Sequence, residues 1–274
     1  MDRYAVFGHP VAHSLSPRIH AHFAAETGQE LSYEAIEAPL DGFTASVRAF
    51  LAAGGRGANV TVPFKGEACG LADLVDPPAA RAGAANTLRV EPDGRIAAFN
   101  TDGVGLVTDL RDHLGVALAG ARVVLVGAGG AAAGVVEALL DAGVAELVIA
   151  NRTAARARAL VGRFRERAAG AVLRAAPFPG LPPADLLVNA TAASLAGTVP
   201  PLPDGVVVKG TCAYDMMYAD APTPFLRWCR TRGAGRTADG LGMLVEQAAE
   251  AFLLWRGVRP DTAGVRALLR PDAR

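Results

Sequence analysis

Lysine is almost absent from this chain. It occurs only at Lys65 and Lys209, although lysine and arginine together number 27, so the other 25 basic residues are arginine. A chain with this bias is expected to use arginine wherever charge alone is needed. Lysine, unlike arginine, can lose its proton when its surroundings favour the neutral amine, which suits it to proton transfer. We therefore interpret Lys65 as a candidate chemical group, with an ordinary surface lysine as the alternative.

Net charge, cysteine pairs and metal-ligand spacings are lacking as well. Acidic and basic residues both number 27, which argues against a nucleic-acid partner for the chain as a whole. Cys69, Cys212 and Cys229 lie far apart and form no CxxC pair, so we expect reduced thiols and a cytoplasmic location. The histidines show no metal-ligand spacing, and we expect no bound metal.

No segment has the character of a membrane helix or an export signal. The chain opens Met1-Asp2-Arg3 and passes directly into strand-like residues, without the apolar stretch of a secretory signal. The longest uncharged run nearby, 123–136, is shorter than the ~20 residues of a membrane helix, and it contains glycines. We therefore expect no membrane partner.

The composition favours substantial folded cores. Apolar residues make up 51% and charged residues 20% of the 274 residues, which suits one large or two medium domains. Strand and helix signals alternate, which predicts an α/β fold. Strands are expected at 4–7, 33–38, 58–62, 122–126, 146–150, 185–190 and 206–212. Helices are expected at 17–25, 42–51, 104–113, 131–140 and 241–255.

Two predicted helix starts carry polar residues that are candidates for chemistry. Pro63 suits the first helical position, which places Lys65 in the first turn, where the helix dipole disfavours a cation. Ser16 and Pro17 fit the N-cap and the first position of the helix at 17–25. Capping explains Ser16 but not Ser14, and two hydroxyls at a helix start would suit a small carboxylate.

Three other polar residues are ambiguous from the sequence. Asp102 is a plausible N-cap for the helix at 104–113, and capping alone would explain it. Asn86 and Gln247 are neutral amides that matter only if a polyol must be held, and Gln247 could simply face solvent.

A glycine-rich turn separates the strand at 122–126 from the helix at 131–140. Gly127-Ala128-Gly129-Gly130, with Gly134 in the helix, resembles a dinucleotide-binding turn. Glycines let the backbone approach a pyrophosphate, and the following helix directs its N-terminus at the anion. The alternative is a tight strand-to-helix turn without a ligand.

The residues after the next strand indicate which cofactor would bind. An NAD site is expected to have a carboxylate about twenty residues after the turn, to hold the ribose hydroxyls. Asn151-Arg152-Thr153 stand there instead, followed by Arg156. Arginine pairs well with a phosphate, so these residues indicate NADP. The alternative is a solvated basic helix face, because further arginines follow closely.

Together these segments resemble the shikimate dehydrogenase family, NADP-dependent reductases of aromatic amino-acid biosynthesis. The resemblance extends nearly from end to end, with many motifs in one order. The motifs are Tyr4-Ala-Val-Phe-Gly8, Ser14-Leu-Ser-Pro17, Asn59-Val-Thr-Val-Pro-Phe-Lys65, Gly83-Ala-Ala-Asn-Thr87, Asn100-Thr-Asp-Gly103, Gly127-Ala-Gly-Gly130, Asn151-Arg-Thr153, Tyr214-Asp-Met-Met-Tyr218 and Asp239-Gly-Leu-Gly-Met-Leu244.

The resemblance implies a fold and a reaction. It implies two α/β domains with a cleft between them: a discontinuous substrate-binding catalytic domain, 1–102 and 239–274, and a Rossmann-like NADP-binding domain, 103–238. The helix at 241–255 would return to the first domain and bring Gln247 to the cleft. The implied reaction is the reversible NADPH-dependent reduction of 3-dehydroshikimate to shikimate, on the way to chorismate. A homodimer is compatible with it.

The resemblance also implies residue roles. Ser14, Ser16 and Tyr218 would hold the substrate carboxylate. The residues implied for its hydroxyls and reacting oxygen are Thr61, Lys65, Asn86, Asp102 and Gln247, with Lys65 as proton donor and Asp102 as its partner. The residues implied for the cofactor are Gly127, Ala128, Gly129, Gly130 and Ala131 at the pyrophosphate, Asn151, Arg152, Thr153 and Arg156 at the adenosine phosphate, Met216 and Gly240 at the nicotinamide, and Thr191.

Two departures from the family pattern are visible. Ala132-Ala133 stand where relatives often have Ser-Arg, which predicts lower cofactor affinity, and Ala192 replaces a common serine. Neither departure touches the implied catalytic pair.

Three other functions fit parts of the same pattern. A quinate/shikimate dehydrogenase would accept both acids and often NAD, and a related enzyme would act on an altered shikimate. A non-catalytic NADP-binding sensor is the option from a different class. Lys65 together with Asp102 argues against the sensor, and Arg152 with Thr153 argues against NAD.

Overall fold

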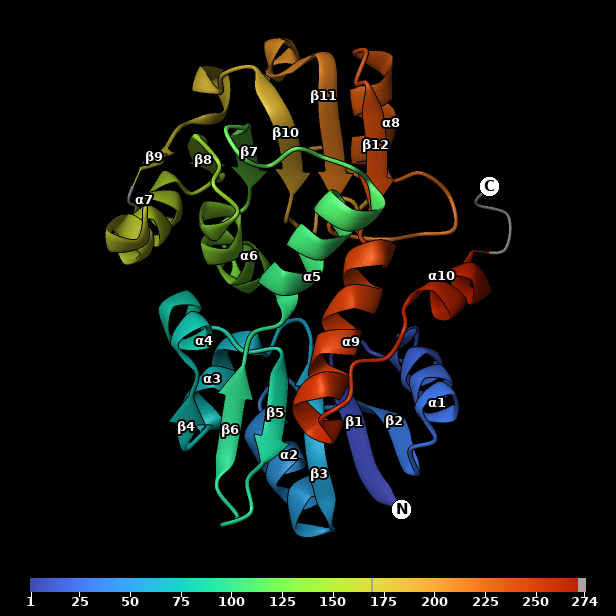
Figure 1. The fold of residues 1–274 in the computed structure, drawn as a ribbon. Coiled ribbons are helices and arrows are strands. Elements are labelled where there is room, and N and C mark those ends of the chain that lie inside the picture. Colours follow the sequence, from blue (N-terminus) through green and yellow to red (C-terminus); the bar gives the residue numbers. More distant parts are fainter. Residues whose placement is uncertain (169, 271–274) are drawn as a thin grey trace. The chain divides into compact units, whose positions relative to one another are not determined.

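The chain forms two units, each built around its own sheet of strands (Figure 1). A computed structural model describes residues 1–168 and 170–270. Unit 1 comprises Met1–Gly105 and the chain from Leu244 onward, and unit 2 comprises Leu106–Met243. The predicted domain boundaries lie a few residues before these divisions. Among the described residues, no helix is long and apolar enough to cross a membrane.

Unit 1 contains a mixed sheet with the strand order β2-β1-β3-β5-β6-β4. Its strands are β1 (Asp2–Gly8), β2 (Leu31–Glu37), β3 (Gly55–Val60), β4 (Leu74–Val75), β5 (Thr87–Val90) and β6 (Ile96–Phe99). The first three strands are parallel, as the predicted alternation of strand and helix requires, whereas β5 is antiparallel to both β3 and β6. The β5–β6 hairpin was not predicted, because both strands are short.

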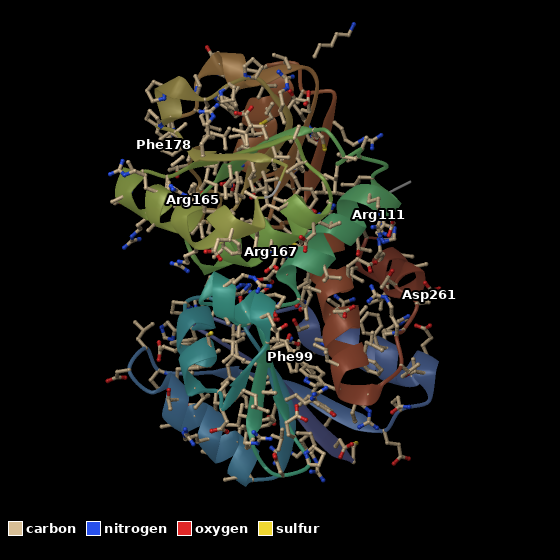
Figure 2. The ribbon with its side chains drawn as sticks, turned by 60° about the vertical axis from the view of Figure 1, so that its left-hand side comes forward. Phe99, Arg111, Arg165, Arg167, Phe178 and Asp261 are labelled. Atoms are coloured by element: carbon tan, nitrogen blue, oxygen red, sulfur yellow. The ribbon has the colours of Figure 1, made fainter. Side chains whose placement is uncertain are left out.

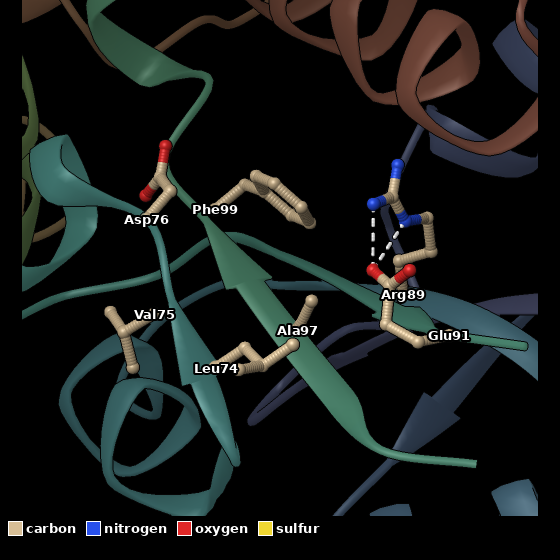
Figure 3. Close-up of a pocket in the computed structure, with 7 residues that line it drawn as sticks. All are labelled: Leu74, Val75, Asp76, Arg89, Glu91, Ala97 and Phe99. Atoms are coloured by element: carbon tan, nitrogen blue, oxygen red, sulfur yellow. Dashed lines mark hydrogen bonds and ion pairs between the residues drawn. The ribbon is translucent and has the colours of Figure 1, made fainter. Parts of the chain in front are cut away.

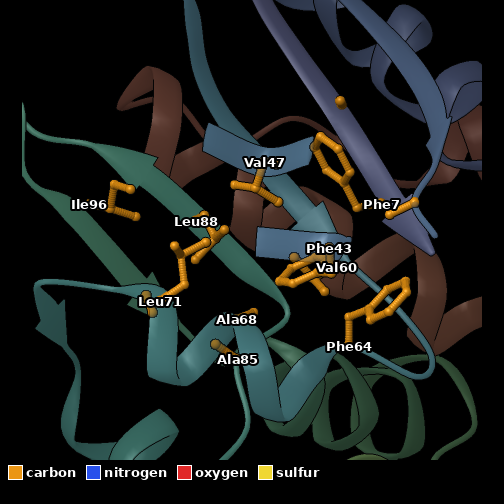
Figure 4. Close-up of a cluster of buried hydrophobic side chains, with 14 of the residues drawn as sticks. Phe7, Phe43, Val47, Val60, Phe64, Ala68, Leu71, Ala85, Leu88 and Ile96 are labelled. Carbon is orange, nitrogen blue, oxygen red and sulfur yellow. The ribbon is translucent and has the colours of Figure 1, made fainter. Parts of the chain in front are cut away.

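Helices pack against this sheet in two groups. They are α1 (Ser16–Thr27), α2 (Phe43–Ala52), α3 (Lys65–Leu71), α4 (Pro77–Ala82), α9 (Leu241–Arg256) and α10 (Ala263–Leu269). The side chains of α2 and α3 join Phe7 and Leu88 of the sheet in one apolar core (Figure 4). Those of α1 and α9 form a second core around Phe23 and Phe252.

Unit 2 contains a parallel sheet with the order β12-β11-β10-β7-β8-β9. Its strands are β7 (Arg122–Val126), β8 (Glu146–Ala150), β9 (Val172–Ala175), β10 (Ala184–Asn189), β11 (Val207–Asp215) and β12 (Arg236–Asp239). Its helices include α5 (Asp102–Thr108, shared with unit 1), α6 (Gly130–Asp141), α7 (Ala154–Phe164) and α8 (Pro224–Thr231). This is the dinucleotide-binding strand order, in which the order of successive strands reverses between β7 and β10 and ligands bind at the carboxyl ends of those strands.

Two predicted helix starts were wrong by one or two residues. Pro63 lies in a turn that Phe64 closes by donating to the Thr61 carbonyl at 3.0 Å, so Lys65 itself is the first residue of α3. Helix α1 already begins at Ser16, and Leu15 occupies the N-cap position without a side-chain bond.

The helix predicted at 104–113 begins two residues earlier and changes form. Asp102 is the first residue of α5, and Asp109–His113 continue as a π-helix. The carboxylate of Asp109 is buried and accepts a hydrogen bond from the Tyr214 hydroxyl at 2.7 Å. A π-turn inserts an extra residue, which allows a helix to redirect one side chain in this way.

A buried acid ties together the carboxyl ends of β10 and β11. Asp215 Oδ1 accepts from Asn189 Nδ2 at 3.0 Å and from the Met217 amide at 3.1 Å. Its Oδ2 accepts from the hydroxyls of Ser194 and Thr223, both at 2.6 Å. Burial raises the pKa of the Asp215 carboxyl, and these four donors oppose that shift by stabilising the charged form.

We expect Asp215→Ala to lower the free energy of unfolding by about 2–4 kcal/mol, because it leaves several buried donors unpaired. Asp185→Ala is the control. Asp185 also accepts several bonds, all from Arg122, but in an exposed ion pair, where the expected loss is at most ~1 kcal/mol. Denaturant unfolding checks both variants, and equal small losses would contradict the structural role of Asp215.

Candidate active site

The clearest chemical feature of unit 1 is a shielded ion pair. Lys65 Nζ lies 2.5 Å from Asp102 Oδ2, and the two side chains are only 14% and 5% exposed. The first turn of α3 disfavours the ammonium of Lys65, and the carboxylate compensates for this. Asp102 therefore does not act as the N-cap that the sequence suggested, because its carboxylate is directed at other side chains.

A cluster of amides completes this ion pair. Asn86 Nδ2 lies 2.9 Å from Asp102 Oδ1 and 3.1 Å from Gln247 Oε1. Gln247 Nε2 donates to the Leu244 carbonyl at 2.9 Å, which fixes its amide. Gln247 is 8% exposed, so the alternative that it faces solvent is wrong. Donors and acceptors that converge in this way suit a ligand with several hydroxyls.

The topology of unit 1 places the other predicted substrate residues at the same edge of the sheet. Thr61 and Lys65 follow β3, whose last residue donates to the Asn86 carbonyl at 2.8 Å. The loop after β1 lies alongside, because His9 donates to the Val62 carbonyl at 3.0 Å. That loop leads to Ser14 at the start of α1.

The two serines are arranged differently from the predicted cap. Ser14 Oγ accepts a hydrogen bond from the Ser16 amide at 3.2 Å, so Ser14 stabilises the helix start. Ser16 is buried, and its hydroxyl interacts with that of Tyr33. The explanation of Ser16 as the N-cap was therefore wrong.

The glycine turn of unit 2 has the geometry of an anion site. Gly127 has φ +125°, and a Cβ there would lie 3.0 Å from the Ala190 carbonyl oxygen, so only glycine fits. Helix α6 begins at Gly130, and its N-cap, Gly129, provides no side-chain cap. The first backbone amides of α6 are therefore left without a side-chain acceptor and can donate to an anion. Ala128 and Ala131 flank Gly129 and Gly130 in the sequence.

The predicted phosphate-binding arginines, Arg152 and Arg156, are exposed. They follow β8, which lies next to β7 in the sheet, and the glycine turn follows β7. Asn151 Nδ2 donates to the Thr153 carbonyl at 3.0 Å and shapes the turn between β8 and α7. Within residues 1–168 and 170–270, neither the Arg152 nor the Arg156 guanidinium has a hydrogen-bond or ion-pair partner.

One other arginine of this region is already paired. Arg167, just beyond α7 (Figure 2), pairs with Glu137 at 3.1 Å and with Asp141 at 2.7 Å. Arg152 and Arg156 differ from Arg167 in having no such partner in the described part of the chain, which fits both a phosphate site and the solvated basic face.

The carboxyl ends of β10, β11 and β12 bring three more predicted cofactor residues together. A Cβ at Gly240 would lie 2.2 Å from the Met216 carbonyl oxygen, so only glycine allows this contact. Met216 donates to the Asn189 carbonyl at 2.9 Å, and Thr191 Oγ1 donates to Asn189 Oδ1 at 2.7 Å. Tyr218, half-buried after β11, belongs to the same unit.

A surface hollow on unit 1 is distinct from this site (Figure 3). It is lined by Leu74, Val75, Asp76, Arg89, Glu91, Ala97 and Phe99, none of which was predicted to bind a ligand. The Arg89 guanidinium is already occupied by Glu91 Oε1, at 2.6 and 2.8 Å, and by the Leu254 carbonyl, at 3.0 Å. The charge of Arg89 is therefore already satisfied within the protein.

Sequence reasoning missed several polar residues next to the ion pair. Thr101 Oγ1 lies 2.9 Å from Asn86 Nδ2, and Asn100 Oδ1 accepts from the Asp102 amide at 3.1 Å. Both directly precede Asp102 in the Asn100–Gly103 motif, which was the available signal. Asn59 and Tyr33 contact each other below Asn86, and only the fold brings them there.

Comparisons with known protein families match three segments of the chain. Residues 6–88 match the shikimate dehydrogenase substrate binding domain, 110–196 match shikimate / quinate 5-dehydrogenase, and 240–270 match the shikimate 5′-dehydrogenase C-terminal domain.

Curated relatives and a solved structure agree with these matches. The shikimate dehydrogenases (NADP(+)) of Alkalilimnicola ehrlichii and Thioalkalivibrio sulfidiphilus are 55% and 56% identical over 272 and 271 residues, with 99% of each chain covered. The Thermus thermophilus shikimate 5-dehydrogenase, solved in complex with NADP(H) and shikimate, is 39% identical, with a TM-score of 0.87 and 99% of both chains covered. The resemblance and the α/β fold predicted from the sequence are confirmed, and the chain belongs to the shikimate dehydrogenase family.

Proposed function

We propose that this protein catalyses the reversible NADPH-dependent reduction of 3-dehydroshikimate to shikimate, in the biosynthesis of chorismate and the aromatic amino acids. The observation that carries the proposal is the shielded Lys65–Asp102 pair with Asn86 and Gln247 around it. A sensor that only binds NADP has no need of such a pair. The names of the curated relatives support the same reaction.

We assign the substrate contacts by chemistry. The hydroxyls of Ser14, Ser16 and Tyr218 suit the carboxylate, because hydrogen bonds to a charged acceptor are stronger than those between neutral groups. The residues that we assign to the ring hydroxyls and the reacting oxygen are Thr61, Lys65, Asn86, Asp102 and Gln247. Within unit 1, the last four form one connected polar cluster, which supports the assignment.

The residues of unit 2 fit NADP. The amides at Gly127–Ala131 would hold the pyrophosphate, because the turn excludes a Cβ and α6 has no side-chain cap. The residues proposed for the adenosine phosphate are Asn151, Arg152, Thr153 and Arg156, and those proposed around the nicotinamide are Thr191, Met216 and Gly240. When bound, NADPH supplies the hydride that the ketone carbon receives.

The protein's own part in the reaction is to manage charge and a proton. As the carbonyl carbon is reduced, its oxygen becomes an alkoxide, and the Lys65 ammonium would stabilise that charge and donate the proton that makes it a hydroxyl. Asp102 holds the ammonium in place and accepts from the neighbouring substrate hydroxyl. The neutral amine of Lys65 then regains a proton from water.

The cytoplasmic location and the homodimer remain proposals. The three cysteines are free, which suits a reducing compartment. The lower cofactor affinity expected from Ala132-Ala133 also remains a prediction.

Initial rates with shikimate and with quinate, each with NADP and with NAD, test the proposed function directly. Shikimate with NADP should be the fastest combination. Equal rates with quinate, or with NAD, would favour the broader quinate/shikimate dehydrogenase, and no turnover with any pair would favour the sensor.

We expect Arg152→Ala to raise the Michaelis constant for NADP roughly tenfold or more and to leave that for NAD nearly unchanged. The lost contact is a charge-assisted hydrogen bond to a phosphate that NAD lacks. Arg158→Ala is the matched control, because Arg158 is exposed on α7, which follows Arg152, but was not assigned to the cofactor. An equal rise for both cofactors would place the 2′-phosphate elsewhere.

We expect Lys65→Arg to lower the turnover number by roughly 10²–10⁴ while NADP affinity stays nearly intact, because arginine keeps the charge but does not release the proton. The chain provides its own control in Lys209→Arg, since Lys209 is the other lysine and is exposed on β11. Near-normal turnover in folded Lys65→Arg would leave Lys65 with a role as a charge only.

A further inference from the structure

A half-buried tyrosine is connected to the proposed catalytic pair by a chain of hydrogen bonds, and its hydroxyl also interacts with that of Ser16. Tyr33, on β2, directs its hydroxyl at Asn59 Oδ1, 2.8 Å away. Its ring stacks on His20 with centroids 4.2 Å apart and planes 8° apart. Burial holds the pKa of the Tyr33 hydroxyl well above its usual range, so the hydroxyl keeps its proton and remains a donor.

The orientation of Asn59 is fixed by a backbone group. Asn59 Nδ2 lies 3.1 Å from the Asn86 carbonyl oxygen, which can only accept, so the NH₂ must be on that side. The amide oxygen of Asn59 therefore faces Tyr33, and Tyr33 must be the donor. The second hydrogen of the Asn59 NH₂ points to Thr87 Oγ1 at 3.1 Å.

The orientation of Asn86 is fixed in the same way. Its Oδ1 accepts from the Thr101 backbone amide at 2.8 Å, which can only donate. Thr87, having accepted from Asn59, donates its hydroxyl hydrogen to the same Asn86 oxygen at 3.1 Å. The NH₂ of Asn86 is left to donate to Asp102 Oδ1.

These contacts form one chain with a single direction of donation. We call it the donor chain: Tyr33, Asn59, Thr87 and Asn86 each donate to the next member, and Asn86 donates to Asp102. Lys65 donates to the other oxygen of the same carboxylate. Asn59, Thr87 and Asn86 are all buried, so a broken link leaves a polar atom without water to replace its partner.

A reversed amide would harm the catalytic pair. If Asn86 turned over, its oxygen would face the Asp102 carboxylate, and two acceptors would repel each other at hydrogen-bond distance. The carboxylate could then rotate, and the ammonium of Lys65 would lose its fixed place. The Thr101 backbone amide opposes this reversal, and the donor chain adds to it through the Thr87 hydroxyl, because both donate to Asn86 Oδ1.

We propose that Tyr33 is a positioning residue for the reaction assigned above, acting through Asn59, Thr87 and Asn86 to hold Asp102 toward Lys65. This inference rests on the proposed function. His20 stacks its ring on Tyr33 and also lies against the Asn59 side chain, although neither ring nitrogen makes a hydrogen bond of good geometry among the described residues. Burial lowers the pKa of His20 to about 3, so the ring is neutral.

Tyr33→Phe tests the inference, because phenylalanine keeps the stack on His20 and removes only the hydroxyl. We expect the turnover number for shikimate oxidation to fall roughly 5- to 30-fold, with the Michaelis constant for NADP unchanged. Tyr4→Phe is the matched control. Tyr4 is buried in the same sheet and its ring stacks on Trp255 at 4.6 Å, but its hydroxyl interacts with Arg256, outside the donor chain.

A second break in the donor chain keeps the test decisive if Tyr33→Phe folds poorly. Thr87→Val keeps the shape of threonine and removes its hydroxyl, whereas Thr87→Ser restores the hydroxyl. We expect Thr87→Val to be as slow as Tyr33→Phe and Thr87→Ser to be near normal. The double variant Tyr33→Phe/Thr87→Val should lose no more than the slower single variant, because both act through Asn86.

Provided that the wild-type protein oxidises shikimate with NADP, either of two results would overturn the inference. One is equal turnover in Tyr33→Phe and Tyr4→Phe, and the other is equal turnover in Thr87→Val and Thr87→Ser. A wild-type protein that does not oxidise shikimate at all would instead remove the proposed function itself.

Discussion

The ion pair between Lys65 and Asp102 constrains the rest of unit 1. A shielded ammonium at the first position of a helix is disfavoured by lost hydration and by the helix dipole, so it needs a carboxylate close by. That carboxylate must in turn be held, since an unpaired buried acid costs several kcal/mol. Asn86, next to the start of β5, donates a hydrogen bond to this carboxylate. The fold of unit 1 brings the starts of α3, β5 and α5 together at one edge of its sheet.

Unit 2 differs from unit 1, because it presents positive potential to a ligand without burying a cation. The turn at Gly127 and the uncapped start of α6 offer backbone amides, and Arg152 and Arg156 after β8 remain exposed and without partners among the described residues. Buried acids such as Asp215 are placed below this surface and are fully bonded. Charge that would serve a ligand is thus kept separate from charge that holds strands together.

Whether the sequence alone predicted a feature depended on how far apart in the chain the interacting residues lie. Strands β7 and β8 were predicted at their observed bounds, because a buried parallel strand is a continuous apolar run. Lys65 was identified by composition, since arginine had replaced nearly every other lysine. Local pattern left Asp102 open between capping and chemistry because its partner lies 37 residues away, and the family resemblance was needed to pair it with Lys65. The donor chain and the β5–β6 hairpin were likewise beyond local pattern, because they depend on which strands the fold makes neighbours.

The central claim is that Lys65 and Asp102 act as one unit, and a double-mutant cycle in the turnover number tests it most directly. The singles are Lys65→Ala and Asp102→Asn, and the double carries both, with folding checked by unfolding curves. If the pair acts as a unit, each single variant is slow and the double loses clearly less than the sum of the two losses. Additive losses would show that the two residues act independently and would contradict the account.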